Sequence, residues 1–387
     1  MPGGFRDQRL TFMPAMRYRA RDFGLDLPGT PGPDNAITDV PGVEVGFATI
    51  QRPAAEAGQA QVFTGVTAIL PRGRQAEPVP VLAGQFDLNG NGEMTGAHWI
   101  RDAGYFTGPI CLTNSHSLGI VHHAAVRYMI DTHQDHFRKF HAWAMPVVAE
   151  TYDGVCSDIC GLHITEDHAL SAMRGARRGP VAEGNVGGGT GMATYEFKGG
   201  TGTSSRRVEL NDRVFTVGAL VQSNFGKRSE LTVLGVPVGK HLTDNAIFSD
   251  HQLPEQGSII VVIATDVPMT AMQLERLAKR GALGIGRTGT SGGHYSGDLM
   301  IAFSVANPIY LPAIGEPQPF SLHYESLNDA HCDEIYSHAV DAVEEAVLNA
   351  LFAAETIPTF KPRGLQLTAI DKGALVALLA RHGRLRT

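Results

Sequence analysis

A β-branched apolar run from Ile259 to Ala264 follows Ser258 and a polar segment at 251–256. A short apolar run bounded by turn residues is typical of a strand that is buried on both faces. Further strands are predicted by similar runs at 36–40, 43–47, 66–70, 214–222 and 299–305. These runs indicate a chain with several buried strands.

Apolar residues at helical spacing predict helices at 124–132 and 167–176, another beginning near Thr270, and a long one at 329–355. Thr270 and Gln273 have the form of a capping box, which marks a helix start. The predicted strands come in neighbouring pairs and the helices stand apart from them, which favours layered α+β packing over alternating βαβ units. No repeat or linker divides the sequence, so we expect one domain over 1–387.

Composition narrows the class of protein. The 387 residues carry a net charge of −7 with 18% charged residues and 45 glycines, which favours a close-packed enzyme. The net negative charge argues against a nucleic-acid partner. No apolar run approaches the ~18 residues of a membrane span, and the N-terminus has no signal-like apolar region. We therefore predict a cytoplasmic protein with neither nucleic acid nor membrane as a partner.

Two motifs resemble metal sites but fail on spacing. Cys156 and Cys160 match no common zinc pattern, so we expect buried free thiols. The segment that begins at Asp87 opens like a calcium loop, but His98 stands at the twelfth position, where a glutamate belongs. We predict no metal and no other cofactor.

Two glycine-rich motifs also have a structural interpretation. The G-x-S-x-G pattern at 289–293 follows a predicted helix and precedes a strand, the reverse of a nucleophile elbow, and so predicts a turn. The run at 184–191 completes neither common phosphate-binding pattern. Its glycines indicate close backbone approach or positive φ.

Ser258 has two interpretations. It can simply begin a strand, as serines often do. If the Gly257–Ser258 bond is cut, however, Ser258 carries both a nucleophilic Oγ and a free α-amine. That amine has a reference pKa of about 7.7 to 8.0, so it can serve as a general base without a histidine.

Other polar residues at strand ends are candidates for the same site. Ser296 and Asp298 are two apart, so their side chains share one side of an extended segment and could form a relay with Ser258. Asn224 closes a predicted strand and could donate to an oxyanion. Glu150 follows an apolar run and could bind an ammonium group. Spacing alone does not bring these residues together.

Longer motifs resemble the P1-type aminopeptidase family, which includes L-aminopeptidase/D-amidase-esterases and β-peptidyl aminopeptidases. The resemblance extends from about Arg19 to Glu355 and is carried, in the same order, by 31–40, 89–96, 147–153, 179–192, 197–206, 220–224 and 257–266.

This resemblance implies a four-layer αββα sandwich related to ornithine acetyltransferases, and a precursor that cuts itself into chains 1–257 and 258–387. It implies Ser258 as nucleophile, Ser296 as relay serine and Asp298 as the carboxylate that orients it. It implies Asn224 as oxyanion donor and Glu150 as the carboxylate for the substrate amine. It also implies a homotetramer of processed protomers.

Two positions bear on substrate choice. Tyr152 matches a tyrosine of the aminopeptidase/esterase branch and would contribute to substrate binding. His294 and Tyr295 stand where small residues are common in the family, which would narrow the pocket or reshape the turn. We therefore expect a self-processing serine aminopeptidase that acts on small peptides, amides or esters with a free amine.

Three alternatives stay open at this point. A β-peptidyl aminopeptidase or oligoamide hydrolase on the same scaffold is the nearest, followed by an acetyl-transferring relative. A non-catalytic binding protein is more remote.

Overall fold

A computed structural model describes residues 19–54, 60–75, 77–250, 257–308 and 319–386. The first of its two main sheets has the order β1 (Glu44–Arg52), β2 (Val62–Leu70), β5 (Ile110–Asn114), β6 (Val147–Thr151). The second has the order β4 (Tyr105–Phe106), β3 (Val81–Gly90), β12 (Gly297–Ser304), β11 (Ser258–Thr265), β10 (Arg213–Asn224), β9 (Gly200–Leu210). Two short pairs, β7 (Ala193–Thr194) with β8 (Phe197–Lys198) and β13 (Ile357–Pro358) with β14 (Gln366–Leu367), lie outside them.

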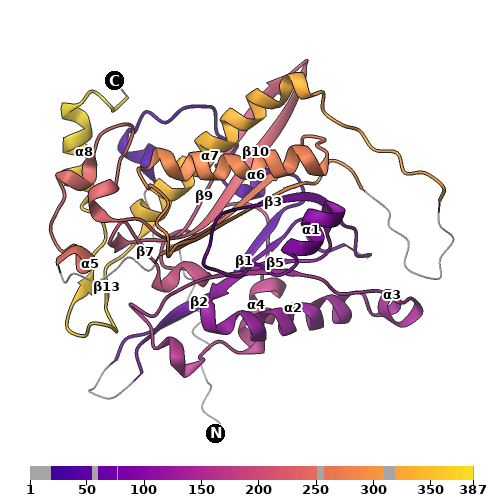
Figure 1. The fold of residues 1–387 in the computed structure, drawn as a ribbon, viewed down its shortest axis with the longest axis horizontal. Coiled ribbons are helices and arrows are strands. Elements are labelled where there is room, and N and C mark those ends of the chain that lie inside the picture. Colours follow the sequence, from indigo (N-terminus) through magenta and orange to yellow (C-terminus); the bar gives the residue numbers. More distant parts are fainter. Residues whose placement is uncertain (1–18, 55–59, 76, 251–256, 309–318, 387) are drawn as a thin grey trace, which may run out of the picture.

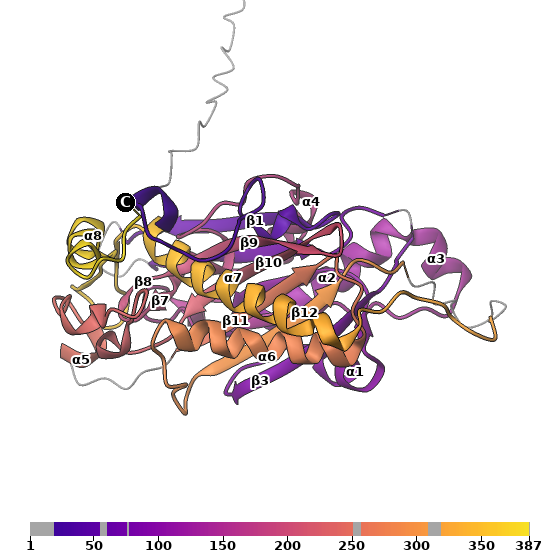
Figure 2. The same ribbon diagram turned by 90° about the horizontal axis from the view of Figure 1, so that it is seen from above.

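The helices of the described residues are α1 (Ala97–Ala103), α2 (Leu118–Thr132), α3 (Gln134–Lys139), α4 (Glu166–Arg174), α5 (Ile247–Asp250), α6 (Ala271–Arg287), α7 (Cys332–Ala353) and α8 (Lys372–Arg381). Among them, α6 and α7 cover the outer face of the second sheet, and α2 and α4 cover that of the first. In Figure 1 the order from top to bottom is α6 and α7, the second sheet, the first sheet, then α2 and α4. Figure 2 looks onto α6 and α7 lying across the second sheet. The four-layer αββα prediction is therefore confirmed.

Burial of both faces explains why the interior positions of strand β11 are all apolar. Ile259, Val261 and Ile263 belong to the core beneath α6 and α7. Ile260, Val262 and Ala264 belong to the core between the two sheets. Side chains alternate across a strand, so a strand with no exposed face needs apolar residues on both sides.

Most predicted elements are confirmed, with their ends extended by a few residues. Thr270 caps α6 and its hydroxyl accepts from the Gln273 N–H at 3.3 Å, which completes the predicted capping box. The prediction for 36–40 was wrong, because Ile37–Asp39 is a 3₁₀ turn that begins a loop. The Asp39 carboxylate accepts from the N–H of Ala36 and so closes that turn locally.

Among the cysteines, Cys156 is a buried free thiol as predicted, whereas Cys160 is exposed. Cys160 lies in a short 3₁₀ segment, Ile159–Gly161, at the surface, so the prediction of burial was wrong for it. Across the described residues, no group of three His, Cys, Asp or Glu side chains could hold a metal ion. No helix in that part of the chain is long and apolar enough to cross a membrane.

A buried ion cluster joins the N-terminal segment, β9 and α7. Arg206 and Glu345 are both fully buried, and Arg206 Nη2 donates to Glu345 Oε2 at 2.7 Å. Arg21 Nε donates to both carboxylate oxygens at 2.9 Å. Burial alone would raise the pKa of Glu345, but the two guanidinium groups hold it below its usual value. The buried carboxylate is thus compensated, and it is the shared partner of both guanidinium groups.

We expect Glu345→Gln to destabilise the protein by about 3 to 5 kcal/mol, because it leaves two guanidinium groups uncompensated in the interior. Urea unfolding of both proteins would measure this difference. The control is Glu275→Gln, which removes the exposed pair of Glu275 with Lys279 and should cost less than about 1 kcal/mol. Equal losses in the two variants would contradict the assigned role of the cluster.

Candidate active site

Strand register brings three residues side by side at one edge of the second sheet. Asn224, the last residue of β10, lies opposite Ser258 in an antiparallel pair. Ser258, the first residue of β11, lies beside Gly297 of β12 in a parallel pair. Residues far apart in sequence therefore meet because three strands start or end at the same level.

The Ser258 hydroxyl is buried and makes two hydrogen bonds. It donates to the carbonyl oxygen of Gly257 at 2.7 Å and accepts from the N–H of Gly297 at 3.2 Å. The nucleophile candidate is thus in direct contact with the peptide group that joins it to Gly257. The polar segment 251–256 before it lies outside the described residues.

Ser296 and Asp298 interact as their spacing suggested. The Ser296 hydroxyl donates to Asp298 Oδ1 at 2.6 Å, and both side chains are buried. Asn89 Nδ2 donates to the other carboxylate oxygen, Oδ2, at 3.0 Å. Burial raises the pKa of Asp298, and the hydrogen bonds from Ser296, Asn89 and the Ile259 backbone oppose that shift.

The Asn224 amide has a defined orientation. Its Oδ1 accepts from the N–H of Ala193 at 2.8 Å, and its Nδ2 donates to the carbonyl oxygen of Tyr152 at 3.1 Å. An amide nitrogen carries two hydrogens, so one donor is left for a further acceptor. The glycine-rich run ends just before Ala193, in a buried 3₁₀ segment at Gly187–Gly191.

Close approach explains these glycines, as the sequence predicted. A Cβ on Gly188 would lie 1.9 Å from Gln222 Oε1, which is too short for a non-bonded contact. Gln222 of β10 in turn donates to Thr151 Oγ1 of β6 at 2.7 Å and so connects the two sheets. The G-x-S-x-G segment is likewise a turn between α6 and β12, where Ser291 Oγ donates to Glu230 Oε1 at 2.7 Å.

Glu150 comes from the end of β6, in the other sheet. Its Oε1 accepts from the N–H of Glu93 at 3.0 Å, and its Oε2 accepts a short hydrogen bond from the Ser115 hydroxyl. A Cβ on Gly92 would contact both Glu150 Oε1, at 3.3 Å, and Gly297 Cα, at 3.5 Å. Glu150 therefore lies close to the edge where Ser258 meets Gly297.

The environment of Glu150 is consistent with binding of a cation. Burial raises the pKa of its carboxyl group, and the hydrogen bonds from Ser115 and Glu93 oppose that shift. Those donors each occupy one oxygen and leave acceptor capacity on both. A substrate ammonium group would supply a compensating charge to this buried carboxylate.

Tyr152 follows Glu150 and is half-buried. A Cβ on Gly154 would lie 2.2 Å from its hydroxyl oxygen, so the phenol packs directly on that glycine. Its carbonyl group contacts Asn224, as described above. The side chain of the next residue, Asp153, is fully buried, which raises its pKa to about 7.

The sequence analysis missed two residues that contact this site. Asn89 was considered within a calcium-like motif and within the family motif 89–96, but it was given no role. Ser115 directly follows β5, and β5 runs parallel to β6. Parallel strands end at the same edge, so the place of Ser115 after β5 was a signal that could have located it near Glu150.

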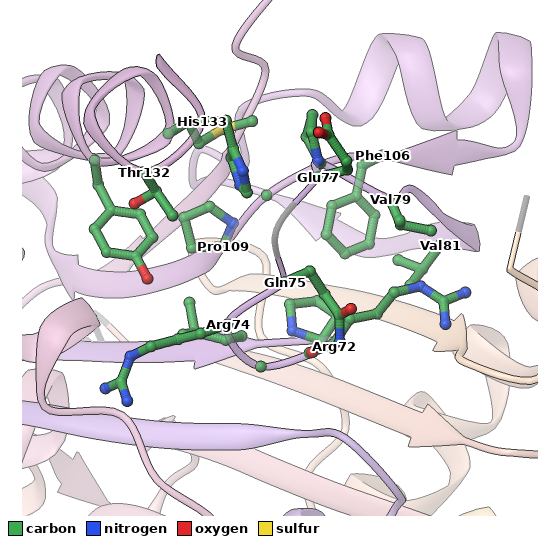
Figure 3. Close-up of a pocket in the computed structure, with 17 residues that line it drawn as sticks. Arg72, Arg74, Gln75, Glu77, Val79, Val81, Phe106, Pro109, Thr132 and His133 are labelled. Atoms are coloured by element: carbon green, nitrogen blue, oxygen red, sulfur yellow. Dashed lines mark hydrogen bonds between the residues drawn. The ribbon is translucent and has the colours of Figure 1, made fainter. Parts of the chain in front are cut away.

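A surface pocket elsewhere does not contain this chemistry. Figure 3 shows a pocket lined by residues that include Arg72, Glu77, Phe106 and His133. It lies where β3 and β5 begin, whereas Asn89 and Asn114 mark where they end. None of the sequence-predicted site residues lines it, so we place the functional site at the opposite ends of these strands.

The arrangement at the Ser258 edge suits acyl transfer. It combines a buried hydroxyl in contact with a carbonyl group, a serine–carboxylate pair, an oriented amide donor and a carboxylate for a cation. Nucleophile, proton relay and oxyanion donor are the parts such a reaction needs.

Comparisons with known proteins identify the family. Peptidase family S58 matches residues 35–364. A β-peptidyl aminopeptidase, BapA, of Sphingosinicella microcystinivorans is 45% identical over 95% of this chain and 93% of its own length.

Two solved structures are similar throughout. The L-aminopeptidase D-Ala-esterase/amidase of Ochrobactrum anthropi, a prototype for the serine aminopeptidases and a variant of the Ntn-hydrolase fold, is 52% identical. Its TM-score is 0.89, with 95% of this chain and 99% of that chain covered. A Burkholderia sp. β-aminopeptidase is 42% identical, with a TM-score of 0.86 over 96% of this chain and 100% of its own.

The family match covers most of the chain, and these relatives are similar over nearly their whole lengths. The chain therefore belongs to Peptidase family S58 and is a hydrolase of the aminopeptidase class with an Ntn-hydrolase fold.

Proposed function

We propose that this aminopeptidase activates itself by cutting the Gly257–Ser258 bond and then removes N-terminal residues from small peptides, amides and esters. The observation that carries the proposal is the contact of Ser258 Oγ with Gly257 O at 2.7 Å, beside Asn224 and Gly297. Chains 1–257 and 258–387 stay associated through the mixed second sheet, since β11 and β12 pair with β3 and β10.

Self-cleavage begins with attack of Ser258 Oγ on the Gly257 carbonyl carbon. The C–N bond breaks as the ester bond to Oγ forms, and the proton from Oγ is delivered to the departing nitrogen. Water then hydrolyses the ester, which leaves a carboxylate on Gly257 and a free α-amine on Ser258. Before this step the Ser258 nitrogen is a peptide N–H and cannot act as a base, so Ser296 and Asp298 are assigned the proton relay.

Substrate turnover uses the same edge of the sheet. The substrate ammonium group binds Glu150, and Ser258 Oγ, deprotonated by its own α-amine or through Ser296, attacks the carbonyl carbon. The second amide hydrogen of Asn224 and a backbone N–H stabilise the oxyanion. The leaving amine or alcohol departs, and water releases the acyl group. Tyr152 forms part of the substrate-binding wall.

A β-peptidyl aminopeptidase is the second candidate, supported by the 45% identity to BapA. The presence of Tyr152 and the 52% identity to the L-aminopeptidase D-Ala-esterase/amidase favour the first. Rates on matched α-, β- and D-configured amino-acid amides would separate the two. The cytoplasmic location and the homotetramer stay predictions.

We expect Ser258→Ala to remain a single chain and to hydrolyse nothing, because no Oγ is left to attack Gly257. Intact mass of the denatured protein and N-terminal sequencing would show whether a fragment beginning Ser-Ile-Ile-Val forms in the wild type alone. Ser337→Ala is the matched control, since Ser337 is exposed on α7 and its hydroxyl donates to Glu334 O of the same helix, and it should be cut normally. A cut Ser258→Ala chain would overturn the assignment.

We expect Glu150→Gln to cut itself normally but to lose activity on free-amine substrates. The substitution keeps the shape and removes the charge that pairs with the ammonium, a loss of at least about 2 kcal/mol or roughly 30-fold in kcat/KM. Hydrolysis of an amino-acid p-nitroanilide, with its N-acetyl derivative as control, would measure it. Equal wild-type rates on the two substrates would contradict the role of Glu150.

A further inference from the structure

The segment from Asn89 to Glu93 contacts functional groups of both sheets. It begins with the last two residues of β3 and precedes α1. The Glu93 N–H donates to Glu150 Oε1 in the first sheet, at 3.0 Å. Asn89 contacts Asp298 in the second sheet. Between them, Gly92 packs against Glu150 and Gly297. This segment therefore connects the proposed ammonium site with the proposed relay.

The same segment holds the turn that carries Ser296. The turn closes with a hydrogen bond from the Ser296 N–H to Gly293 O, at 2.9 Å. Asn89 Nδ2 donates to that same Gly293 carbonyl at 3.2 Å, and Asn91 Nδ2 donates to Tyr295 O at 2.6 Å. Two asparagine side chains thus fix the carbonyl groups on either side of the exposed His294–Tyr295 pair.

A β-bulge directs Asn89 toward Asp298. The two residues are paired across β3 and β12, but the next pair joins Leu299 to Asp87, which leaves Leu88 as an extra residue on β3. A bulge of this kind changes the direction of the neighbouring side chain. The amide nitrogen of Asn89 consequently reaches Asp298 Oδ2.

The chemistry of the contact favours one protonation state. An amide nitrogen only donates, so its hydrogen bond to Oδ2 is strongest while the carboxyl group carries no proton. Oδ1 is the acceptor for the Ser296 hydroxyl. The oxygen of Ser296 has lone pairs of its own, with which it would accept a proton from Ser258.

No charged side chain is needed to explain this preference. The groups that contact the Asp298 carboxyl are the amide of Asn89 on β3, the Ser296 hydroxyl and the Ile259 backbone on β11. The ionisable groups nearest in sequence are engaged elsewhere. Asp87 pairs with Arg101 at 3.1 Å, and the His294 ring packs against that of Tyr295.

We propose that Asn89 is a positioning residue of the reaction, which keeps Asp298 ionised and aligned so that Ser296 can relay the proton of Ser258. The inference rests on the proposed function and adds a residue to it. Asn91 supports the same turn but contacts only a carbonyl group, so its contribution is to geometry alone.

The test compares Asn89→Ala, Asn89→Asp and Asn91→Ala with the wild type. The readouts are the rate of self-cleavage by intact mass, thermal unfolding, and kcat against pH on an amino-acid p-nitroanilide. In a plot of log kcat against pH, protonation of the α-amine gives the acidic side a slope of one. At lower pH, protonation of Asp298 as well increases that slope to two. The pH of that change in slope reports Asp298 separately from the α-amine.

We expect Asn89→Ala to lower kcat at least about tenfold, the value of a hydrogen bond to a charged group, and to slow self-cleavage. The pKa of Asp298 should rise without its donor, so the change in slope should move to higher pH. Asn89→Asp keeps the shape but places a second carboxylate beside the first, and it should move the change further. Asn91→Ala should lower kcat less and leave that pH unchanged.

The inference is overturned if both Asn89 variants keep the wild-type kcat and the wild-type pH at which the slope of log kcat changes. It is also overturned if the variants lower only the unfolding temperature. A wild-type chain that neither cuts itself nor hydrolyses free-amine substrates would instead overturn the proposed function, and this inference with it. The two failures are therefore distinguishable.

Discussion

The site depends on the register of one central strand that has no exposed face. The side chains of β11 from Ile259 to Ala264 pack either under α6 and α7 or against the first sheet, so hydroxyl groups stand only at the two ends of the strand, at Ser258 and Thr265. At the first position, Ser258 pairs with β12 on one side and with Asn224 of β10 on the other. A slip by one residue would place Ile259 at this position and exchange the two cores, so apolar packing itself specifies the position of the nucleophile.

The second constraint is that the two sheets must keep a fixed position relative to each other, because Glu150 and the serine–aspartate pair come from different sheets. Packed sheets lie roughly 10 Å apart, too far for one hydrogen bond. Gln222 spans that gap in the interior, and the segment from Asn89 to Glu93 spans it at the edge. Glycine at position 92 lets that segment pass between Glu150 and Gly297.

Sequence patterns predicted the elements that are buried along their length. They did not predict the contacts that depend on strand register and loop conformation. The β11 run and the α7 stripe were recognisable because two cores require apolar residues at fixed periods. Ser296 and Asp298 were predicted as a pair because their spacing suits an extended segment. The run at 36–40 failed because the side chain of Asp39 closes a local turn. Asn89 was missed because its contact with Asp298 depends on a bulge at Leu88, which no spacing rule shows.

Under the proposed mechanism one set of side chains serves two reactions with different bases. In the uncut chain the Ser258 nitrogen belongs to a peptide bond, so the proton of Oγ can leave only through neighbouring side chains. After cleavage the α-amine is available and titrates near neutrality. Asp298 and its partners are therefore required most for self-cleavage, the step that produces the mature enzyme. The hydrogen bonds of Asp298 with Ser296 and Asn89 are already formed in the uncut chain, as that order of events requires.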